Sequence, residues 1–97
     1  MSYGRGGAGM KLHKLKCWPT YFDAVKRGEK PFEVRKNDRD FQVGDTVMLC
    51  RLQRDSASAP YDRSEPPLHF KIGYILHGGE FGIDNTHCVM SLIAPPK

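Results

Sequence analysis

The sequence lacks any apolar run of 18 or more residues, so we expect no membrane-spanning helix. It also lacks the apolar segment of a secretory signal, because its N-terminus reads MSYGRGGAGM. We interpret residues 1–10 as a flexible arm, or as an expression remnant ahead of a start at Met10. The three cysteines are few, odd in number and far apart, which indicates reduced thiols in a cytoplasmic protein.

Recognisable metal and phosphate motifs are also missing. His13 and Cys17 are four residues apart, but no second ligand pair follows at zinc spacing. The Asn37–Asp40 stretch is typical of a polar turn and lacks the remaining calcium ligands. GGEFG, residues 78–82, predicts a hairpin turn because no strand and helix flank it as in a phosphate loop. We therefore expect no metal and no cofactor.

Residues 11–97 have the length of one small domain, and the full chain of 97 residues is 39% apolar and 27% charged. Such a chain buries a modest core, so we expect any ligand site in a surface cleft, and we favour a monomer. Net charge is +4 overall, with +5 in residues 1–40 and −1 in residues 41–97. This asymmetry favours an anionic partner, of which nucleic acid is the commonest.

Hydrophobic patterning predicts one helix and five strands, joined by turns and by an irregular, mobile loop at residues 53–67. The expected helix covers residues 19–27, with Pro19 at its first position and Gly28 after its last. The expected strands cover residues 11–17, 32–36, 46–52, 68–77 and 87–93. The predicted fold is α+β, with a small, curved, mostly antiparallel sheet.

Residues 68–77 alternate clearly, which places Tyr74 on the same face as Leu68, Phe70, Ile72 and Leu76. Gly73 in the middle of this strand predicts a bend or bulge, as at the corner of a barrel.

Lys30, Glu33 and Arg35 form the central candidate site. Glu33 and Arg35 share one face of the strand at 32–36, and Lys30 lies just before it. The group would combine a lysine, a carboxylate that orients it, and a planar guanidinium suited to phosphate. A surface ladder of salt bridges is the alternative, and spacing alone favours that alternative.

Other residues could extend the site. Lys36 and Arg39 add positive charge after the strand, and Glu80 could reach a cleft from the GGEFG turn. Trp18 and Tyr21 lie in the basic half and could stack on a base, as could Tyr61, Tyr74 and Phe81. For each aromatic residue the alternative is core packing, and for Trp18 we favour the core.

GEKPFEVR, Gly28 to Arg35, matches the G-x-K-x-x-E-x-R signature of ASCH domains in the PUA-like superfamily. The F-x-V-G-D stretch from Phe41 to Asp45 resembles the same family's turn into its next strand. KLKCWPTYFDAVKRGEKPFEVRKNDRDFQVGD and YILHGGEFGI resemble a small subfamily of uncharacterised bacterial and phage ASCH-like proteins. This resemblance runs from about Lys11 to Ile93.

The resemblance implies a PUA-like β-barrel of five or six strands with one or two short flanking helices. It also implies a cleft that binds RNA or a nucleotide through the signature residues. Some small ASCH proteins deacylate N4-acylated cytidine nucleosides, with a lysine at the position of Lys30 as base and a threonine at that of Glu33. A later glutamate assists them, and Glu80 is its nearest counterpart here.

We therefore predict an RNA or nucleotide binding module in which Lys30, Arg35, Lys36 and Arg39 contact phosphate. Glu33 would orient Lys30 or accept a hydrogen bond from a base amine. The alternative is an amidohydrolase with Lys30 as general base, assisted by Glu33 or Glu80. A phage accessory protein that binds a host protein is a third reading, without a sequence signature.

Overall fold

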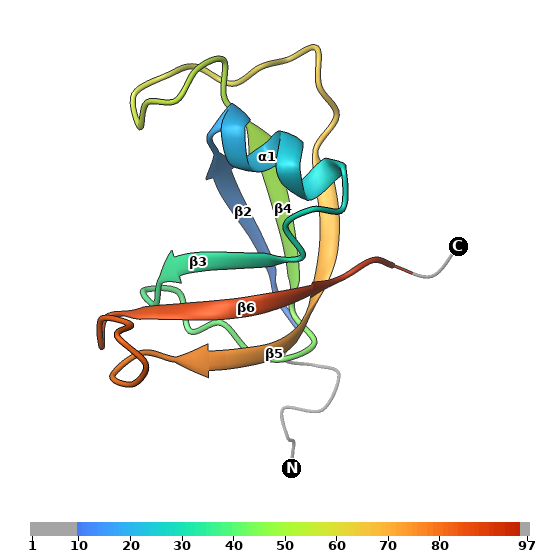
Figure 1. Cartoon of the computed structure of the whole chain (residues 1–97). Helices are drawn as coiled ribbons and strands as arrows, with labels where there is room; N and C mark the ends of the chain where they lie inside the picture. The colour runs from blue at the N-terminus through green and yellow to red at the C-terminus, as the bar shows by residue number, and fades with distance from the viewer. Residues whose placement is uncertain (1–9, 96–97) are drawn as a thin grey trace.

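The computed structural model describes residues 10–95, which form one five-stranded sheet and one helix (Figure 1). The predicted arm at residues 1–10 lies outside this range except for Met10. The sheet order is β2-β4-β5-β6-β3. In chain order the elements are β2 (Leu12–Cys17), α1 (Pro19–Lys26), β3 (Phe32–Lys36), β4 (Thr46–Arg51), β5 (Leu68–His77) and β6 (His87–Ile93).

Each predicted element is confirmed within one residue at either end. β2 and β4 run parallel, and the other three neighbouring pairs are antiparallel. The sheet is therefore mostly antiparallel, as expected, and its hydrophobic periodicity was a sufficient guide to the elements.

β5 is the strand that curls the sheet. Its first residues, from Leu68, pair with β4, and its later residues pair with β6. The register with β6 shifts between Ile72 and Ile75, so Gly73 lies in an irregular stretch, as predicted. Figure 1 shows β5 bending there from the upright pair β2 and β4 to the flatter pair β6 and β3. A strand that bends at a bulge is a usual way to turn a corner between two halves of a sheet.

The bulge also overturns one expectation about this strand. Tyr74 was predicted to share a face with Ile72, but Ile72 is buried and Tyr74 is 67% exposed. The extra residue at the bulge interrupts the period of two, so Ile75 packs on the core instead.

The five strands form a curled half-barrel, which is consistent with the small β-barrel-like α+β fold predicted from the sequence. β2 and β3 are its two edge strands, and no backbone ladder joins them among the described residues. Two arginine side chains reach across this open seam instead. Arg35 Nη2 donates to the Lys16 carbonyl at 2.6 Å, and Arg39 Nη1 donates to the Lys14 carbonyl at 2.8 Å.

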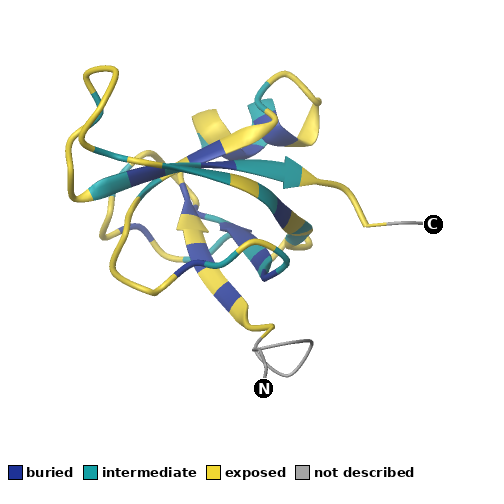
Figure 2. Cartoon of the chain, turned by 90° about the horizontal axis from the view of Figure 1, so that it is seen from below, coloured by how far each residue is buried: buried dark blue, intermediate teal, exposed yellow. Residues whose placement is uncertain are grey.

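The core fills the concave side of the sheet. Its largest buried members include Leu15, Phe22, Leu49, Ile72 and Met90. Figure 2 shows the buried residues alternating with exposed ones along the strands, as expected when one face of a sheet is covered.

The helix α1 covers the end of the sheet near the open seam. Phe22 and Val25 are its buried residues, and both join the core. Pro19 starts the helix, and Gly28, with φ of 81°, lets the chain turn away after it. The Lys30 amide then donates to the Ala24 carbonyl, which brings the chain from the helix directly to β3.

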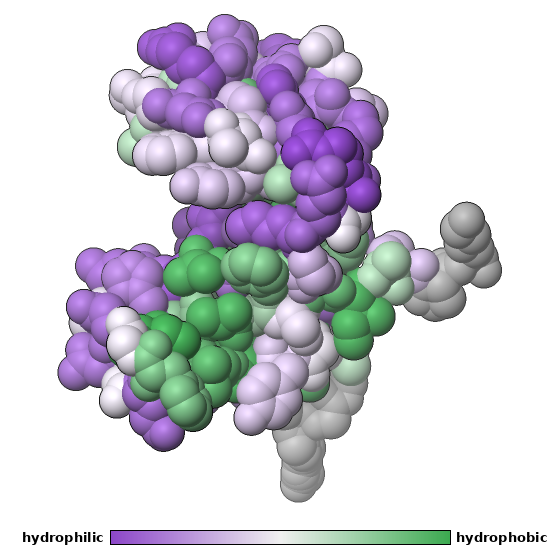
Figure 3. Space-filling model, viewed as in Figure 1, coloured by the Kyte–Doolittle hydropathy of each residue, from purple (hydrophilic) through white to green (hydrophobic). Residues whose placement is uncertain are grey.

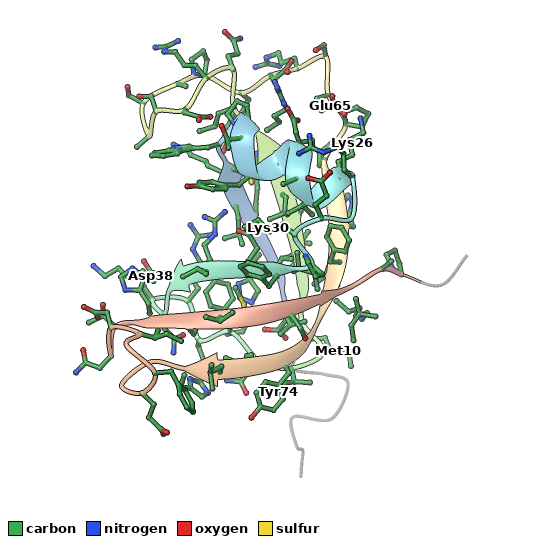
Figure 4. The ribbon with its side chains drawn as sticks, in the orientation of Figure 1. Met10, Lys26, Lys30, Asp38, Glu65 and Tyr74 are labelled. Atoms are coloured by element: carbon green, nitrogen blue, oxygen red, sulfur yellow. The ribbon has the colours of Figure 1, made fainter. Side chains whose placement is uncertain are left out.

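Residues 53–67 contain no strand, as expected, but they are tied to the rest of the fold. Arg51 donates to both Asp23 and Asp62, and Lys26 pairs with Glu65 at 2.6 Å (Figure 4). Ala59 is buried. These contacts tie the segment to β4 and α1. Within residues 10–95 the one helix is too short and too polar to cross a bilayer.

Candidate functional site

The open seam between β2 and β3 contains a pocket of about 620 Å³. Figure 3 shows the molecule hollowed between its hydrophilic upper part and a more hydrophobic lower part. The volume falls within the roughly 300–1,000 Å³ range of small-molecule sites. The pocket is lined by Lys16, Cys17, Trp18, Tyr21, Lys30, Phe32, Glu33, Val34 and Arg35.

Glu33 lies at the centre of the polar wall. Its carboxylate accepts from Lys30 Nζ at 2.9 Å and from Arg35 Nε at 2.8 Å. Glu33 is only 3% exposed, so both oxygens are used in an environment with little water. The surface ladder that spacing favoured is therefore wrong, because the charged face of β3 turns inward and Phe32 and Val34 face outward.

Lys30 is held on several sides (Figure 4). Besides Glu33, its Nζ donates to the Phe32 carbonyl at 2.8 Å. It also lies 5.5 Å from the centroid of the Tyr21 ring and 4.9 Å from that of Phe32. Carboxylate, carbonyl and ring faces are all partners of an ammonium cation. A general base, in contrast, needs a neutral amine with a free lone pair.

Arg35 connects the two edges of the seam. Its Nε binds Glu33 on its own strand, while its Nη2 binds the Lys16 carbonyl on β2. A guanidinium suits this task because it carries donors in a fixed planar fork. Glu33 thus fixes the orientation of Arg35, and Arg35 holds the width of the pocket.

Trp18 and Tyr21 form the aromatic wall. Their rings are nearly parallel, 14° apart, with centroids separated by 6.1 Å. Trp18 is 40% exposed, so the expectation that it belongs to the core is wrong. It caps the start of α1, where Pro19 follows, and this position keeps its ring at the mouth of the pocket.

Cys17 is a buried residue that lines the pocket. Burial, and next the negative charge of Glu33, raise its pKa to about 12. A thiol with that pKa is neutral at physiological pH and a poor nucleophile. The pocket therefore offers no activated cysteine.

Positive charge dominates the polar groups of the pocket. Lys16, Lys30 and Arg35 line it together with a single carboxylate, Glu33. Lys16 has no carboxylate partner among residues 10–95, so its charge is available to a ligand. Flat aromatic faces beside an excess of cations suit a planar anion.

The structure brings together five of the predicted site residues: Trp18, Tyr21, Lys30, Glu33 and Arg35. Lys36 and Arg39 lie outside the pocket, and the Arg39 guanidinium is engaged with the Lys14 carbonyl. Glu80 is exposed in the turn between β5 and β6 and does not line the pocket. Tyr74 and Phe81 are also exposed elsewhere.

Sequence reasoning missed Lys16 and Cys17 at the end of β2. Lys16 could have been found, since a strand leading into Trp18 must pass beside the aromatic wall. Phe32 and Val34 were missed because an apolar alternation is usually assigned to the core.

A second buried polar pair, His13 and Asp45, lies outside the pocket. Asp45 of the predicted turn accepts from His13 Nε2 at 2.8 Å and from the amides of Lys11 and Gln42. Burial opposes its ionisation, but these hydrogen bonds outweigh burial and hold the pKa of Asp45 below its ordinary value. The pair joins β2 to the start of β4.

Comparison with known proteins places this pocket in a family. A family model described as "Domain of unknown function (DUF3850)" matches residues 12–92. These residues include the whole pocket and all five strands, except for Ile93 at the end of β6. The chain belongs to the DUF3850 family.

This DUF3850 chain also resembles a phage protein. It is 46% identical over 39 residues to the "Uncharacterized 12.9 kDa protein in GpA 3'region" of Escherichia phage P2. The match covers 40% of this chain and 36% of the phage protein, so it spans about a third of that relative's length.

The DUF3850 fold, in the part that the structure describes, has no group of three His, Cys, Asp or Glu side chains placed to hold a metal ion. The pocket offers one buried carboxylate, two cations paired with it, a lysine without a carboxylate partner in residues 10–95, and three aromatic rings.

Proposed function

We propose that this DUF3850 chain is an ASCH-like module that binds RNA or a nucleotide in the pocket at the open seam. The observation that carries the proposal is the convergence of Lys30, Glu33 and Arg35 with Trp18 and Tyr21 around one pocket. These residues come from the end of β2, from α1 and from β3, and they meet only in the folded chain.

The pocket has one group of side chains suited to the base of a nucleotide and another suited to its phosphate. A base can stack on the rings of Trp18 and Tyr21, an interaction that does not require a particular base. A phosphate can meet Lys16 and the outer face of the Arg35 guanidinium. Glu33 already accepts two hydrogen bonds, so its role in this proposal is to orient both cations.

The contacts favour binding over the amidohydrolase alternative. Lys30 donates to Glu33 and to the Phe32 carbonyl, so it is arranged as a cation and not as a base. Glu80, the counterpart of the assisting glutamate, lies outside the pocket. Cys17 does not replace them, because its raised pKa keeps the thiol protonated.

Direct binding measurements test the proposal. Purified protein is titrated with nucleoside monophosphates and with single-stranded, structured and double-stranded RNA and DNA, followed by calorimetry and anisotropy. We expect saturable binding whose affinity falls between about 50 and 200 mM salt in proportion to the phosphates contacted. No binding to any of these ligands at the lower salt concentration would end the proposal.

A further inference from the structure

The outer face of β2 carries two lysines, one at each of two pockets. Lys16 lines the pocket at the seam, and Lys14 lines a second pocket of about 250 Å³. Residues two apart on a strand share a face and lie about 7 Å apart. The two pockets are therefore neighbours along one strand, although β4 and the 53–67 segment supply most of the second.

The second pocket has its own aromatic residue. Tyr61 lines it, and Lys14 Nζ lies 4.8 Å from the centroid of the Tyr61 ring. Tyr61 is half-buried, and its backbone is bridged to Leu52 beside β4. The bridge fixes the backbone from which the ring extends toward Lys14.

Free positive charge connects the two pockets. Lys14 and Lys16 are exposed, and Arg63, which also lines the second pocket, is exposed. None of the three pairs with a carboxylate within residues 10–95. Arg51 is different, because Asp23 and Asp62 neutralise it and hold its guanidinium in place.

We infer that the ligand is a single-stranded nucleic acid that spans both pockets, with one base on Trp18 and Tyr21 and a nearby base on Tyr61. Its backbone follows β2, where Lys16 and Lys14 meet successive phosphates. The flexible Lys14 side chain moves from the Tyr61 ring to the phosphate as the base takes its place. This inference rests on the proposed function and narrows its ligand.

The two stacking sites, Trp18 with Tyr21 and Tyr61, favour a single strand over a duplex. Both sites stack on the faces of bases, and in a duplex those faces are covered by the neighbouring base pairs. A free mononucleotide fills only one of the two stacking sites. A strand gains from both, because the second contact is made within a complex that already exists.

The test compares ligands of increasing length on the full chain. Nucleoside monophosphates, oligo(U) and oligo(dT) of about eight nucleotides, and the matching duplexes are titrated into wild-type protein and into Tyr61→Leu. Tyr61→Leu keeps apolar bulk and removes the stacking ring. Lys14→Gln is a second variant on an exposed position, and Tyr74→Leu is the matched control, since Tyr74 is exposed and lines neither pocket.

We expect wild type to bind a single strand more tightly than a monophosphate or a duplex. Tyr61→Leu should weaken the single strand by about 5- to 100-fold and leave the monophosphate unchanged. Lys14→Gln should lower the salt slope of strand binding by about 0.7. Tyr74→Leu should change nothing.

Two results would overturn the inference while leaving the proposed function intact. One is a monophosphate that binds as tightly as the single strand. The other is a Tyr61→Leu protein that is folded by circular dichroism and binds the strand like wild type. If no monophosphate, single strand or duplex binds wild type, the proposed function fails and the inference fails with it.

Discussion

The Glu33 carboxylate lies 2.8 Å from Nε of Arg35, and the same guanidinium donates to the Lys16 carbonyl across the seam. The width of the pocket thus depends on a carboxylate in its polar wall. Lys30 is fixed by the other oxygen of that carboxylate. One buried residue therefore organises both cations and the spacing between two strand edges.

Removing this charge should loosen the pocket and the fold together. Glu33→Gln leaves the half-buried cations Lys30 and Arg35 with a weaker acceptor, and we expect it to lower the free energy of unfolding by about 1–3 kcal/mol. Urea denaturation measures this. The matched control is Glu29→Gln, whose exposed pair with Arg27 should matter little. Equal losses in the two variants would contradict the central role of Glu33.

Acid should weaken the fold through Asp45. Its pKa is held below the ordinary value in the folded state, so its contribution is present above that ordinary value and is lost as the pH falls through the folded pKa. We expect Asp45→Asn to destabilise the fold by about 3 kcal/mol at neutral pH, as when one partner of a buried pair is removed.

The same variant gives the pH test. The difference in unfolding free energy between wild type and Asp45→Asn should shrink as the pH falls below about 4, where Asp45 is protonated in the unfolded chain. Denaturation curves over a pH series measure it. A difference that stays constant down to pH 2 would show that the Asp45 charge is not what stabilises the turn.

The unpaired lysine should matter for binding and little for stability. Lys16→Gln removes one cation from the pocket, so the salt slope of single-strand binding should fall by about 0.7. Lys71→Gln is the control, since Lys71 is an exposed lysine on β5 that lines neither pocket. Both variants should unfold like wild type. If the salt slope of Lys16→Gln equals that of wild type, Lys16 does not contact a phosphate of the bound strand.

The amidohydrolase alternative makes its own prediction. Acetylated cytidine incubated with high concentrations of the protein should remain intact by chromatography, because Lys30 is engaged as a cation. Release of cytidine that disappears in Lys30→Met would instead make Lys30 a base. The fold of that variant would be checked by circular dichroism.

Much of the fold was predictable because each element has a local signal. Pro19 and Gly28 mark the helix, and Gly73 marks the bulge in β5. What followed from the bulge was not predicted: the extra residue turned Tyr74 outward and Ile75 inward. A one-residue shift reverses every later side chain, and local patterns do not reveal it.

The site was predictable in its residues and not in its geometry. Alternation placed Glu33 and Arg35 on one face of β3, but it does not say which face turns inward. The inward turn depends on contacts with Lys16 and Lys30, which belong to other segments. The His13–Asp45 pair was missed for the same reason, because its partners are 32 residues apart.

Trp18 offers the most direct measurement, because it is the sole tryptophan of the chain and it lines the pocket. Its fluorescence is followed while single-stranded oligo(U) is added at low salt to wild type and to Lys16→Gln. The account predicts a saturable change in emission for wild type, a weaker affinity for Lys16→Gln, and loss of the signal at high salt. Binding by anisotropy with no change in Trp18 emission would place the ligand elsewhere and contradict the account.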